Sequence, residues 1–268
     1  MKQSLTAIVL TLNEEANVGD CLACLSFCDE VVVVDSFSTD RTVEICRSVP
    51  GVRVLQRAYR GDSGQRNWAM DQVAGPWMLF LDADERVTPG LAREIERKVL
   101  SSGTREECFA LRRENVFIDR IIRHSGWAND RVVRLVRKGA VRYPKMRIHA
   151  DILLPGRKIQ ALDAPMTHYT FRSLEQYLVK LRRYAVLAAA DLHRRGRRAG
   201  LPELLFRPLW RFLRQYIVQR GFADGVHGLL VCGLQAYGSF LKWAQLWEWE
   251  RFERKGIPFE LPPGEGET

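Results

Sequence analysis

Three carboxylates follow an apolar run in the segment WMLFLDADERVTPG, residues 77–90. Two unit charges about 4 Å apart at an effective dielectric of about 20 repel by about 4 kcal/mol. A positive group should therefore lie between Asp82, Asp84 and Glu85, or their side chains should point apart. An Asp-x-Asp pair at the end of a buried strand also suits a divalent cation that bridges a diphosphate. Such Mg²⁺ or Mn²⁺ ions are usually held by one or two carboxylates plus substrate phosphates.

The first hundred residues contain the elements that must position these carboxylates. Apolar runs of strand length alternate with segments of helical periodicity, such as EANVGDCLACLSF and GQRNWAMDQVA. Strands that are apolar on both faces and alternate with helices indicate a mostly parallel sheet with helices on both sides. The predicted fold is a doubly wound α/β domain. Its predicted strands are LTAIVLT, EVVVVDS, VRVLQR and WMLFLD.

Polar residues collect at the carboxyl ends of these strands, which is where open α/β sheets bind ligands. Asp35 follows four valines, and Asp82 directly follows Leu81. Helix capping would explain Asn13, Ser38 and Asp40, but it requires neither Asp35 nor Asp82. The sequence therefore predicts a site at this rim. Its candidate residues are Thr11, Leu12, Asn13, Glu14, Asp35, Ser38, Asp40, Asp82 and Asp84.

The pattern changes after residue 103. CFALRRENVFI, DRVVRLVRKG and DILLPG predict short antiparallel strands, and a basic helical region follows from Ser173. We expect a catalytic domain over residues 1–172, a basic helical region over 173–258 and a disordered Pro/Gly-rich tail over 259–268.

Composition narrows the class of protein. A hydrophobic content of 46% indicates a folded chain, and a net charge of +9 favours anionic partners such as phosphorylated ligands, membranes or nucleic acid. Neither G-x-x-x-x-G-K-[ST] nor G-x-G-x-x-G occurs, which argues against P-loop and dinucleotide-fingerprint enzymes. The N-terminus lacks a signal-peptide pattern, so a cytoplasmic location is expected.

Several motifs resemble glycosyltransferases of family 2, which have the GT-A fold. IVLTLNEE, VVVVDSFSTDRT, GQRNWA and FLDADE match the nucleotide-sugar-binding half of that family in order and spacing. HSGWANDRVVRLVRKG, THYTFRSLEQYLVKLRRYA and the segment from Gly221 to Glu248 resemble its lipopolysaccharide core-biosynthesis branch. The resemblance implies a metal-dependent, inverting transfer from a nucleotide sugar, with UDP-hexose as the default donor and a lipopolysaccharide inner-core or other lipid-linked glycan as acceptor.

The resemblance also implies roles for individual residues. The Thr11–Glu14 turn and Asp35 would hold the nucleoside, with Asp35 bonding the base. Arg66 would lie near the diphosphate, which suits its planar set of donors. Asp82 would face the ribose or the donor sugar, and Asp84 would bind Mg²⁺ or Mn²⁺.

An inverting transfer needs a base that takes the proton of the acceptor hydroxyl. Asp130 matches a position where the family carries an acidic residue. The family pattern also has a histidine followed by glutamate near RIHADILL, where this chain has His149 and Ala150, with Asp151 one step later. Asp130 is the first candidate for the base and Asp151 the second. His149 is a candidate metal ligand, or a loop histidine with a structural hydrogen bond.

The basic helical region suggests a membrane surface. RPLWRFLRQYIVQR places Arg207, Arg211 and Arg214 on one helical face, and Trp210 on another. Such a helix suits the inner face of the cytoplasmic membrane, although a core-packed helix with a solvated basic face fits almost as well. Ionisable residues and glycines in residues 225–247 argue against a spanning helix.

Other classes remain open at this point. They are a polyprenyl-phosphate glycosyltransferase, a nucleotidyltransferase and a non-enzymatic basic module that binds membrane or nucleic acid. The third leaves the carboxylate rim unexplained, so we expect a nucleotide-sugar donor and no nucleic-acid partner.

Overall fold

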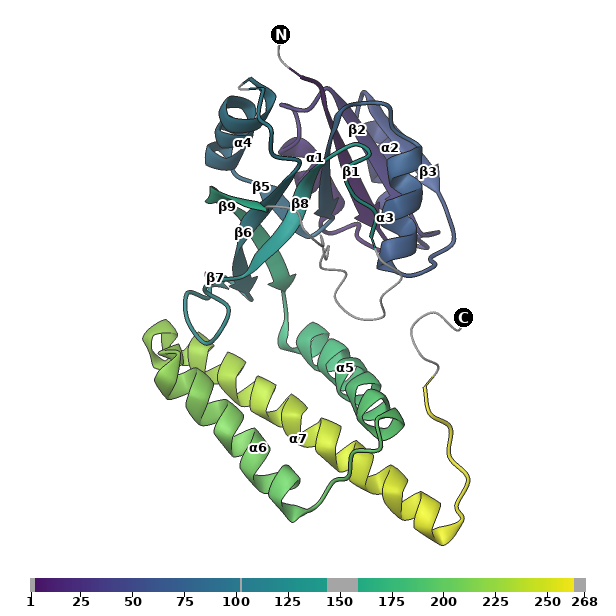
Figure 1. Ribbon diagram of the computed structural model, residues 1–268, viewed down its shortest axis with the longest axis vertical. Helices are drawn as coiled ribbons and strands as arrows, with labels where there is room; N and C mark the ends of the chain where they lie inside the picture. The colour runs from purple at the N-terminus through teal and green to yellow at the C-terminus, as the bar shows by residue number, and fades with distance from the viewer. Residues whose placement is uncertain (1–2, 102, 144–158, 263–268) are drawn as a thin grey trace. The chain divides into compact units, whose positions relative to one another are not determined.

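The structure is a computed structural model, and it describes residues 3–101, 103–143 and 159–262 (Figure 1). The chain divides into two compact units. The first comprises residues 1–114 and 129–168, and the second comprises residues 115–128 and 169–267. Each unit has its own layers and core.

A parallel block forms one half of the sheet in the first unit. It contains β1 (Leu5–Thr11), β2 (Glu30–Asp35), β3 (Val52–Gln56) and β4 (Trp77–Asp82), in the order β3-β2-β1-β4. Thr11 pairs with Asp35, and Leu10 pairs with Asp82. The residues at the carboxyl ends of β1, β2 and β4 therefore meet at one edge of the sheet, as the sequence predicts.

Helices cover both faces of this block, which explains why its strands are apolar on both sides. Alternate β1 residues such as Ala7 and Val9 belong to one buried cluster, with residues of α1 (Val18–Ala23) and α4 (Pro89–Ile95). Ile8 belongs to a second cluster, with residues of α3 (Asp62–Asp71). The remaining helical elements are α2 (Thr42–Ser48) and η1 (Glu96–Leu100).

Antiparallel strands continue the same sheet beyond β4. They are β8 (Arg131–Arg137), β6 (Cys108–Phe117), β9 (Gln160–Phe171) and β5 (Glu85–Val87), in the order β4-β8-β6-β9-β5. The short β7 (Arg120–Ile121) pairs with the end of β6. The predicted α/β fold class, with a parallel block followed by an antiparallel region and basic C-terminal helices, is confirmed. The segment DILLPG lies outside the described residues, and the long strand β9 was not predicted.

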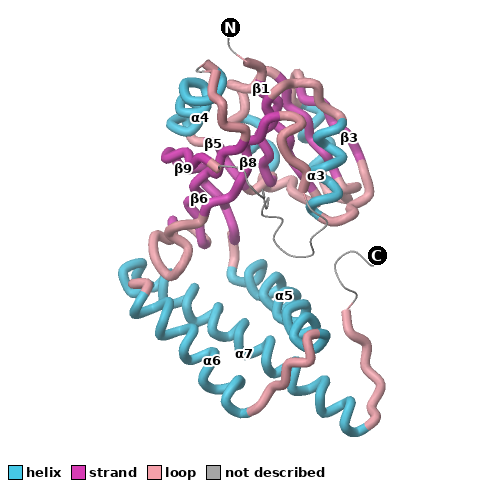
Figure 2. Tube along the Cα trace, viewed as in Figure 1, coloured by secondary structure: helices cyan, strands magenta, loops and turns pink. Residues whose placement is uncertain are grey.

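Helices dominate the second unit (Figure 2). They are α5 (Leu174–Arg194), α6 (Leu201–Leu213), η2 (Arg214–Val218), η3 (Gly221–Asp224) and α7 (Gly225–Lys255). The long helix α7 contacts both α5 and α6. A Cβ on Gly228 would lie 1.9 Å from the carbonyl oxygen of Gly221, so only glycine allows η3 to approach α7 this closely.

Two tryptophans of α7 belong to the core of this helical unit. Trp243 and Trp249 are 4% and 5% exposed, and they pack with Ala189 and Ala190 of α5. Their rings are therefore held inside the unit and are not available at its surface. Within the described residues, no helix is long and apolar enough to cross a bilayer.

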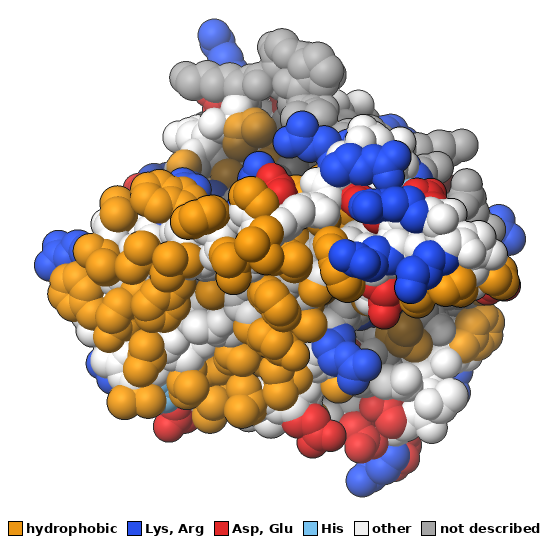
Figure 3. All heavy atoms as spheres, turned by 90° about the horizontal axis from the view of Figure 1, so that it is seen from below, with side chains coloured by type: hydrophobic (Ala, Val, Ile, Leu, Met, Phe, Trp, Pro, Cys, Tyr) orange, Lys and Arg blue, Asp and Glu red, His pale blue; other side chains and the backbone are white. Residues whose placement is uncertain are grey.

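The helix α6 has no fully buried residue, and most of its hydrophobic side chains are exposed (Figure 3). Phe206 and Val218 are 67% and 69% exposed. Figure 3 shows hydrophobic side chains gathered over this side of the molecule, with lysines and arginines at one flank. We name the following exposed residues the apolar face: Leu201, Leu205, Phe206, Leu209, Trp210, Leu213, Ile217, Val218, Phe222, Val226, Leu229 and Leu230.

Candidate functional site

The ends of β1 and β2 are joined through the buried carboxylate of Asp35. Its oxygens accept hydrogen bonds from Thr11 Oγ1 at 3.2 Å, from the Ser38 amide at 3.0 Å and from Gln56 Nε2 at 3.1 Å. The Ser38 hydroxyl donates to it as well. Asp35 therefore orders the loop that follows β2. Gln56 is its exposed donor, and a ligand donor could replace that contact.

Two loops at this rim are tied to each other by side chain–backbone hydrogen bonds. Asn13 has φ +56° and accepts from the Thr39 amide at 2.8 Å, while its own amide donates to Ser38 Oγ at 2.8 Å. Asp40 accepts from the amide of Glu15 at 3.0 Å, and the Glu14 amide donates to Thr42 Oγ1 at 2.7 Å. These contacts join the two loops rather than cap a helix, since neither α1 nor α2 has a side-chain cap at its N-cap residue, and they leave Leu12 exposed at the rim.

Arginines bind Asp82 from two sides. Arg66 Nη2 donates to Asp82 Oδ1 at 3.0 Å, and Arg134 Nη2 donates to Asp82 Oδ2. Burial by itself would raise the pKa of Asp82. The charges of Arg134 and then Arg66 outweigh burial and hold the pKa well below its usual range. Asp82 is therefore ionised at neutral pH, at the end of β4.

The same Arg134 also binds Glu85, which is fully buried. The distance from Arg134 Nη2 to Glu85 Oε1 is 2.8 Å, and Glu85 Oε2 accepts from the Asp82 amide at 3.0 Å. Burial lowers the pKa of Arg134, but the charges of Asp82 and Glu85 raise it further than burial lowers it. One buried guanidinium thus lies between two of the three carboxylates of the WMLFLDADE segment and removes their repulsion.

Asp84 points to a different partner. His168 Nε2, on β9, lies 3.4 Å from Asp84 Oδ2. The pairing of β5 with β9 places His168 opposite Glu85, which brings the histidine to the rim. Both side chains are largely buried, at 18% exposure for Asp84 and 13% for His168.

Asp130 forms a two-pronged ion pair with Arg113 of β6. Arg113 Nε and Nη2 each donate to one carboxylate oxygen at 2.9 Å. Arg113 Nη1 also lies 3.4 Å from Glu85 Oε1. Acidic and basic groups therefore alternate from Asp130 through Arg113, Glu85 and Arg134 to Asp82. This chain lies wholly within the first unit and connects the candidate base to the end of β4.

A divalent cation fits the pair of Asp84 and His168. Two donors about 2.1 Å from one metal, at angles near 90–110°, lie about 3.0–3.4 Å apart, and the observed separation is 3.4 Å. No group of three or more His, Cys, Asp or Glu side chains that could hold a metal occurs in the described part of the chain. Two protein donors leave positions for water and diphosphate oxygens, which is how Mg²⁺ and Mn²⁺ are commonly held with substrate phosphates.

Several site residues were not found from the sequence. Arg113, Arg134 and His168 come from antiparallel strands, and their proximity to Asp82 and Asp84 depends on a strand order that periodicity does not reveal. The alternation of arginines in DRVVRLVRKG is the one signal for Arg134, since it shows a charge on a half-buried strand. The candidates His149 and Asp151 lie outside the described residues.

Comparison of the sequence with known proteins identifies the family. The sequence model described as "Glycosyl transferase family 2" matches residues 6–177, more than half of the chain. The lipopolysaccharide core biosynthesis glycosyltransferase LpsC of Rhizobium meliloti is 29% identical over 252 residues, covering 92% of this chain and 93% of that protein. An uncharacterized glycosyltransferase of Rickettsia typhi is 27% identical over 263 residues, covering 92% of this chain and 87% of that protein.

Solved structures give weaker likenesses. S. aureus TarS 1-349 has a TM-score of 0.48 at 19% identity, covering 96% of this chain and 93% of that chain. Glucosyl-3-phosphoglycerate synthase from Mycobacterium tuberculosis, in complex with Mn²⁺, UDP and glucosyl-3-phosphoglycerate, has a TM-score of 0.35 at 19% identity, covering 42% of this chain and 44% of that chain. The extent of the family match decides the classification: the chain is a glycosyltransferase and belongs to glycosyltransferase family 2.

Proposed function

We propose that this glycosyltransferase moves a hexose from a UDP-hexose to a lipopolysaccharide inner-core or other lipid-linked glycan acceptor, with inversion at the anomeric carbon. The observation that carries the proposal is the convergence of Asp35, Asp82 and the Asp84–His168 pair at the carboxyl ends of β1, β2 and β4. At this one rim, Asp35 could accept a hydrogen bond from a nucleobase, and Asp82 could accept hydrogen bonds from a sugar. Asp84 and His168 could together bind a metal ion.

The nucleoside would lie on the loops after β1 and β2. An imide N–H of the base would donate to Asp35 in place of Gln56. The side chains of Leu12 and Phe37, which are 48% and 56% exposed, offer an apolar surface against which the nucleobase could pack. The fixed conformation of the Asn13 and Asp40 loops makes this surface available without reordering, which limits the entropy lost on binding.

The diphosphate would lie near Asp84, His168 and Arg66. When bound there, a cation neutralises the charge that develops on the leaving diphosphate. A nitrogen ligand favours Mn²⁺ over Mg²⁺, because Mg²⁺ is a hard cation that takes oxygen ligands. Arg66 and Arg134 hold Asp82 ionised, and its carboxylate would accept hydrogen bonds from the hydroxyls of the donor sugar.

The acceptor hydroxyl requires a base on the opposite side of the sugar from the diphosphate, because direct displacement inverts an α-linked donor to a β-linked product. Asp130 remains the first candidate. Arg113 occupies both of its oxygens, so a proton must be taken through the remaining lone pairs of the carboxylate. Arg113 would then be a positioning residue that fixes the direction of Asp130.

A relative supports the proposed acceptor class, and the second unit supports the proposed place of action. The relative LpsC is described as acting in lipopolysaccharide core biosynthesis, which supports a glycolipid acceptor here. The apolar face, with basic side chains at its flank (Figure 3), suits an anionic bilayer because apolar side chains insert while arginines meet phosphate headgroups. We therefore infer peripheral attachment to the inner face of the cytoplasmic membrane.

A donor screen tests the proposal. Purified full-length protein is incubated with Mn²⁺, a core-type glycolipid and a panel of UDP-, GDP- and dTDP-sugars, and the products are analysed by mass spectrometry. We expect transfer from a UDP-hexose with a β-linkage in the product. Transfer only from a GDP- or dTDP-sugar, or retention of configuration, would contradict the donor or the mechanism respectively.

A further inference from the structure

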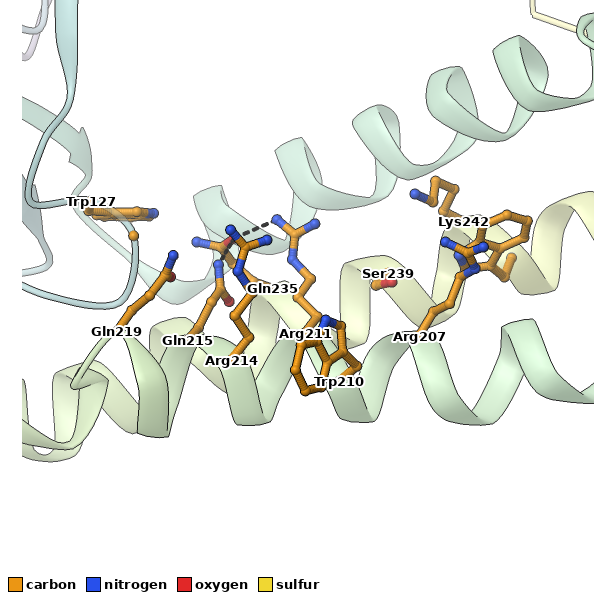
Figure 4. Close-up of a pocket in the computed structure, with 12 residues that line it drawn as sticks. Trp127, Arg207, Trp210, Arg211, Arg214, Gln215, Gln219, Gln235, Ser239 and Lys242 are labelled. Atoms are coloured by element: carbon orange, nitrogen blue, oxygen red, sulfur yellow. Dashed lines mark hydrogen bonds between the residues drawn. The ribbon is translucent and has the colours of Figure 1, made fainter.

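A pocket of about 530 Å³ lies in the second unit, lined by α6, η2, α7 and the Gly126–Trp127 segment (Figure 4). All of its lining residues belong to the helical unit. The donor-site residues described above belong to the first unit and contribute nothing to it. Its volume is within the range of pockets that bind small molecules.

The pocket collects positive charge. Arg207, Arg211, Arg214 and Lys242 line it, and no Asp or Glu is among its lining residues. Figure 4 shows the three arginine side chains extending from the same side of the α6–η2 segment. No ion pair to any of the four cations occurs within the part of the chain that the structure describes. These are the arginines that the sequence suggests for the membrane surface, and they line a concave site.

The cations also lie close enough to repel one another electrostatically. The guanidinium carbon of Arg207 is 4.9 Å and the Lys242 ammonium 5.3 Å from the centre of the same Trp243 ring. Burial lowers the pKa of Lys242, and the charges of Arg211 and Arg207 lower it further. Burial likewise lowers the pKa of Arg211, and Arg214 adds to that effect. An anion in the pocket would relieve these repulsions, and a phosphate suits the forked donors of arginine.

Amide groups beside the cations have unused acceptors. Gln235 Oε1 accepts from Arg211 Nη2 at 2.6 Å and from Gln215 Nε2 at 2.8 Å. The Oε1 atoms of Gln215 and Gln219 are buried and have no hydrogen-bond partner among the described residues. A buried acceptor without a donor is destabilising, because it has lost its hydrogen bonds to water. A dianionic phosphate has no proton to donate to these atoms, but the hydroxyls of a sugar do.

Gly126 and Trp210 also line the pocket. Gly126 has φ +84°, and a Cβ at this position would lie 2.8 Å from Gln219 Oε1, so a larger residue would displace the glutamine. Trp210 is 63% exposed and also belongs to the apolar face. Its ring offers the pocket an aromatic surface, against which the C–H face of a pyranose ring can pack.

We propose that this pocket binds a phosphorylated saccharide, with the phosphate at the four cations and the sugar hydroxyls at the glutamines. The assignment of this saccharide to the acceptor rests on the proposed function, whereas the binding does not. The ligand is either the headgroup of a glycolipid, presented at the adjoining apolar face, or a soluble sugar phosphate. The two sources share one chemistry, and the experiment separates them.

Calorimetric titration of the full-length protein tests the proposal, with chelator present and no nucleotide sugar, so that donor binding does not contribute. We expect glucose 6-phosphate to bind at least about 10-fold more tightly than glucose or inorganic phosphate. Arg211→Gln and, separately, Arg214→Gln should weaken this binding about 10- to 100-fold, the effect of losing a hydrogen bond to a charged group. The matched control Arg183→Gln removes the same charge from an exposed site on α5 and should change the affinity less than about 2-fold.

A second arm identifies the source of the saccharide. Phosphatidylcholine vesicles carrying monophosphoryl lipid A, a phosphorylated disaccharide lipid, are compared with phosphatidylglycerol vesicles of equal surface charge. Stronger binding to the former that is lost in Arg214→Gln supports a glycolipid headgroup. Binding of glucose 6-phosphate without this vesicle preference supports the site and assigns it to a soluble ligand. Equal effects of the pocket and control variants, or no preference for the phosphorylated sugar, would overturn the proposal. Donor turnover by the unaltered protein shows separately whether the proposed function stands.

Discussion

At the scale of single residues, the three carboxylates after β4 have separate partners. Arg134 binds Asp82 and Glu85, and Asp84 lies beside His168. The repulsion among the three carboxylates is therefore relieved in two ways. Asp82 and Glu85 share one guanidinium, and Asp84 points toward a different partner. Only the third is placed to share a metal ion with a histidine.

Removing either of these two donors should abolish metal-dependent turnover. We expect Asp84→Asn and His168→Gln each to lower kcat by at least about 10²-fold, because each change removes one of the two protein ligands proposed for the cation. A manganese titration of UDP-hexose turnover measures the effect. Asp20→Asn, which changes a carboxylate that is 80% exposed, serves as the control. Wild-type turnover by both site variants across the titration would show that the metal lies elsewhere.

The assignment of Asp130 as the catalytic base is tested by changing Asp130 and its partner Arg113 one at a time. We expect Asp130→Asn to lower kcat by at least about 10²-fold with little change in UDP affinity, the low end for loss of a general base. Asp151→Asn should have a smaller effect. Arg113→Gln leaves the carboxylate in place but unoriented, so it should lower kcat less than Asp130→Asn does.

The reverse order would give a different assignment. If Asp151→Asn causes the larger loss, the base lies in the His149–Asp151 loop. If Asp130→Asn and Arg113→Gln lower the melting temperature equally and leave kcat unchanged, Asp130 is only the structural partner of Arg113.

At the scale of elements, the parallel block and the C-terminal helices could be predicted because each carries a local signal. The runs before Asp35 and Asp82 are too apolar for a half-exposed strand, and helical periodicity marks the segments between them. Strand β9 and the order β4-β8-β6-β9-β5 carry no such signal, since antiparallel pairing joins residues far apart in the sequence. The sequence therefore located the carboxylates at the rim but not Arg134 or His168, which arrive from that half of the sheet.

Strand β8 should depend strongly on its buried arginine. Arg134→Met leaves the carboxylates of Glu85 and Asp82 without their shared cation, and breaking a buried ion pair in this way costs about 3–5 kcal/mol. Urea denaturation monitors the loss. Arg131→Met, at an exposed position of the same strand, should cost less than about 1 kcal/mol. Adding Glu85→Gln to Arg134→Met should cost less than the two single changes together, and full additivity would contradict the pairing.

At the scale of the whole molecule, the segment that the sequence predicts to be one amphipathic helix contributes to two different features. Its arginines line the basic pocket, and its hydrophobic side chains form part of the apolar face. Arg211 and Arg214 line the pocket, while Phe206 and Val218 remain in solvent. The sequence left open whether α6 packs into a core, and its exposed apolar side chains favour a binding surface instead.

Membrane attachment should depend on these side chains. Phe206→Ser combined with Val218→Ser should reduce flotation with anionic vesicles by at least about 10-fold, since burying one such side chain is worth about 1.5–3 kcal/mol. Added salt should weaken the binding of the unaltered protein, because the charge contribution is screened. Ile159→Ser removes an exposed hydrophobic residue of the first unit and should change nothing. Equal flotation of the double variant and the unaltered protein would exclude the apolar face.

We infer that the rim formed by Asp35, Asp82, Asp84 and His168 binds a nucleotide diphosphate through a metal. Thermal denaturation of the unaltered protein and of Asp84→Asn, with UDP, with Mn²⁺, with both, and with RNA, tests it most directly. At a UDP concentration about 100-fold above Kd, binding adds about 2.7 kcal/mol, which corresponds to a rise in Tm of about 5–10 °C. We predict this rise only for UDP together with Mn²⁺, its loss in Asp84→Asn, and no rise with RNA. An equal rise with UDP in the presence of chelator, in both proteins, would contradict the claim.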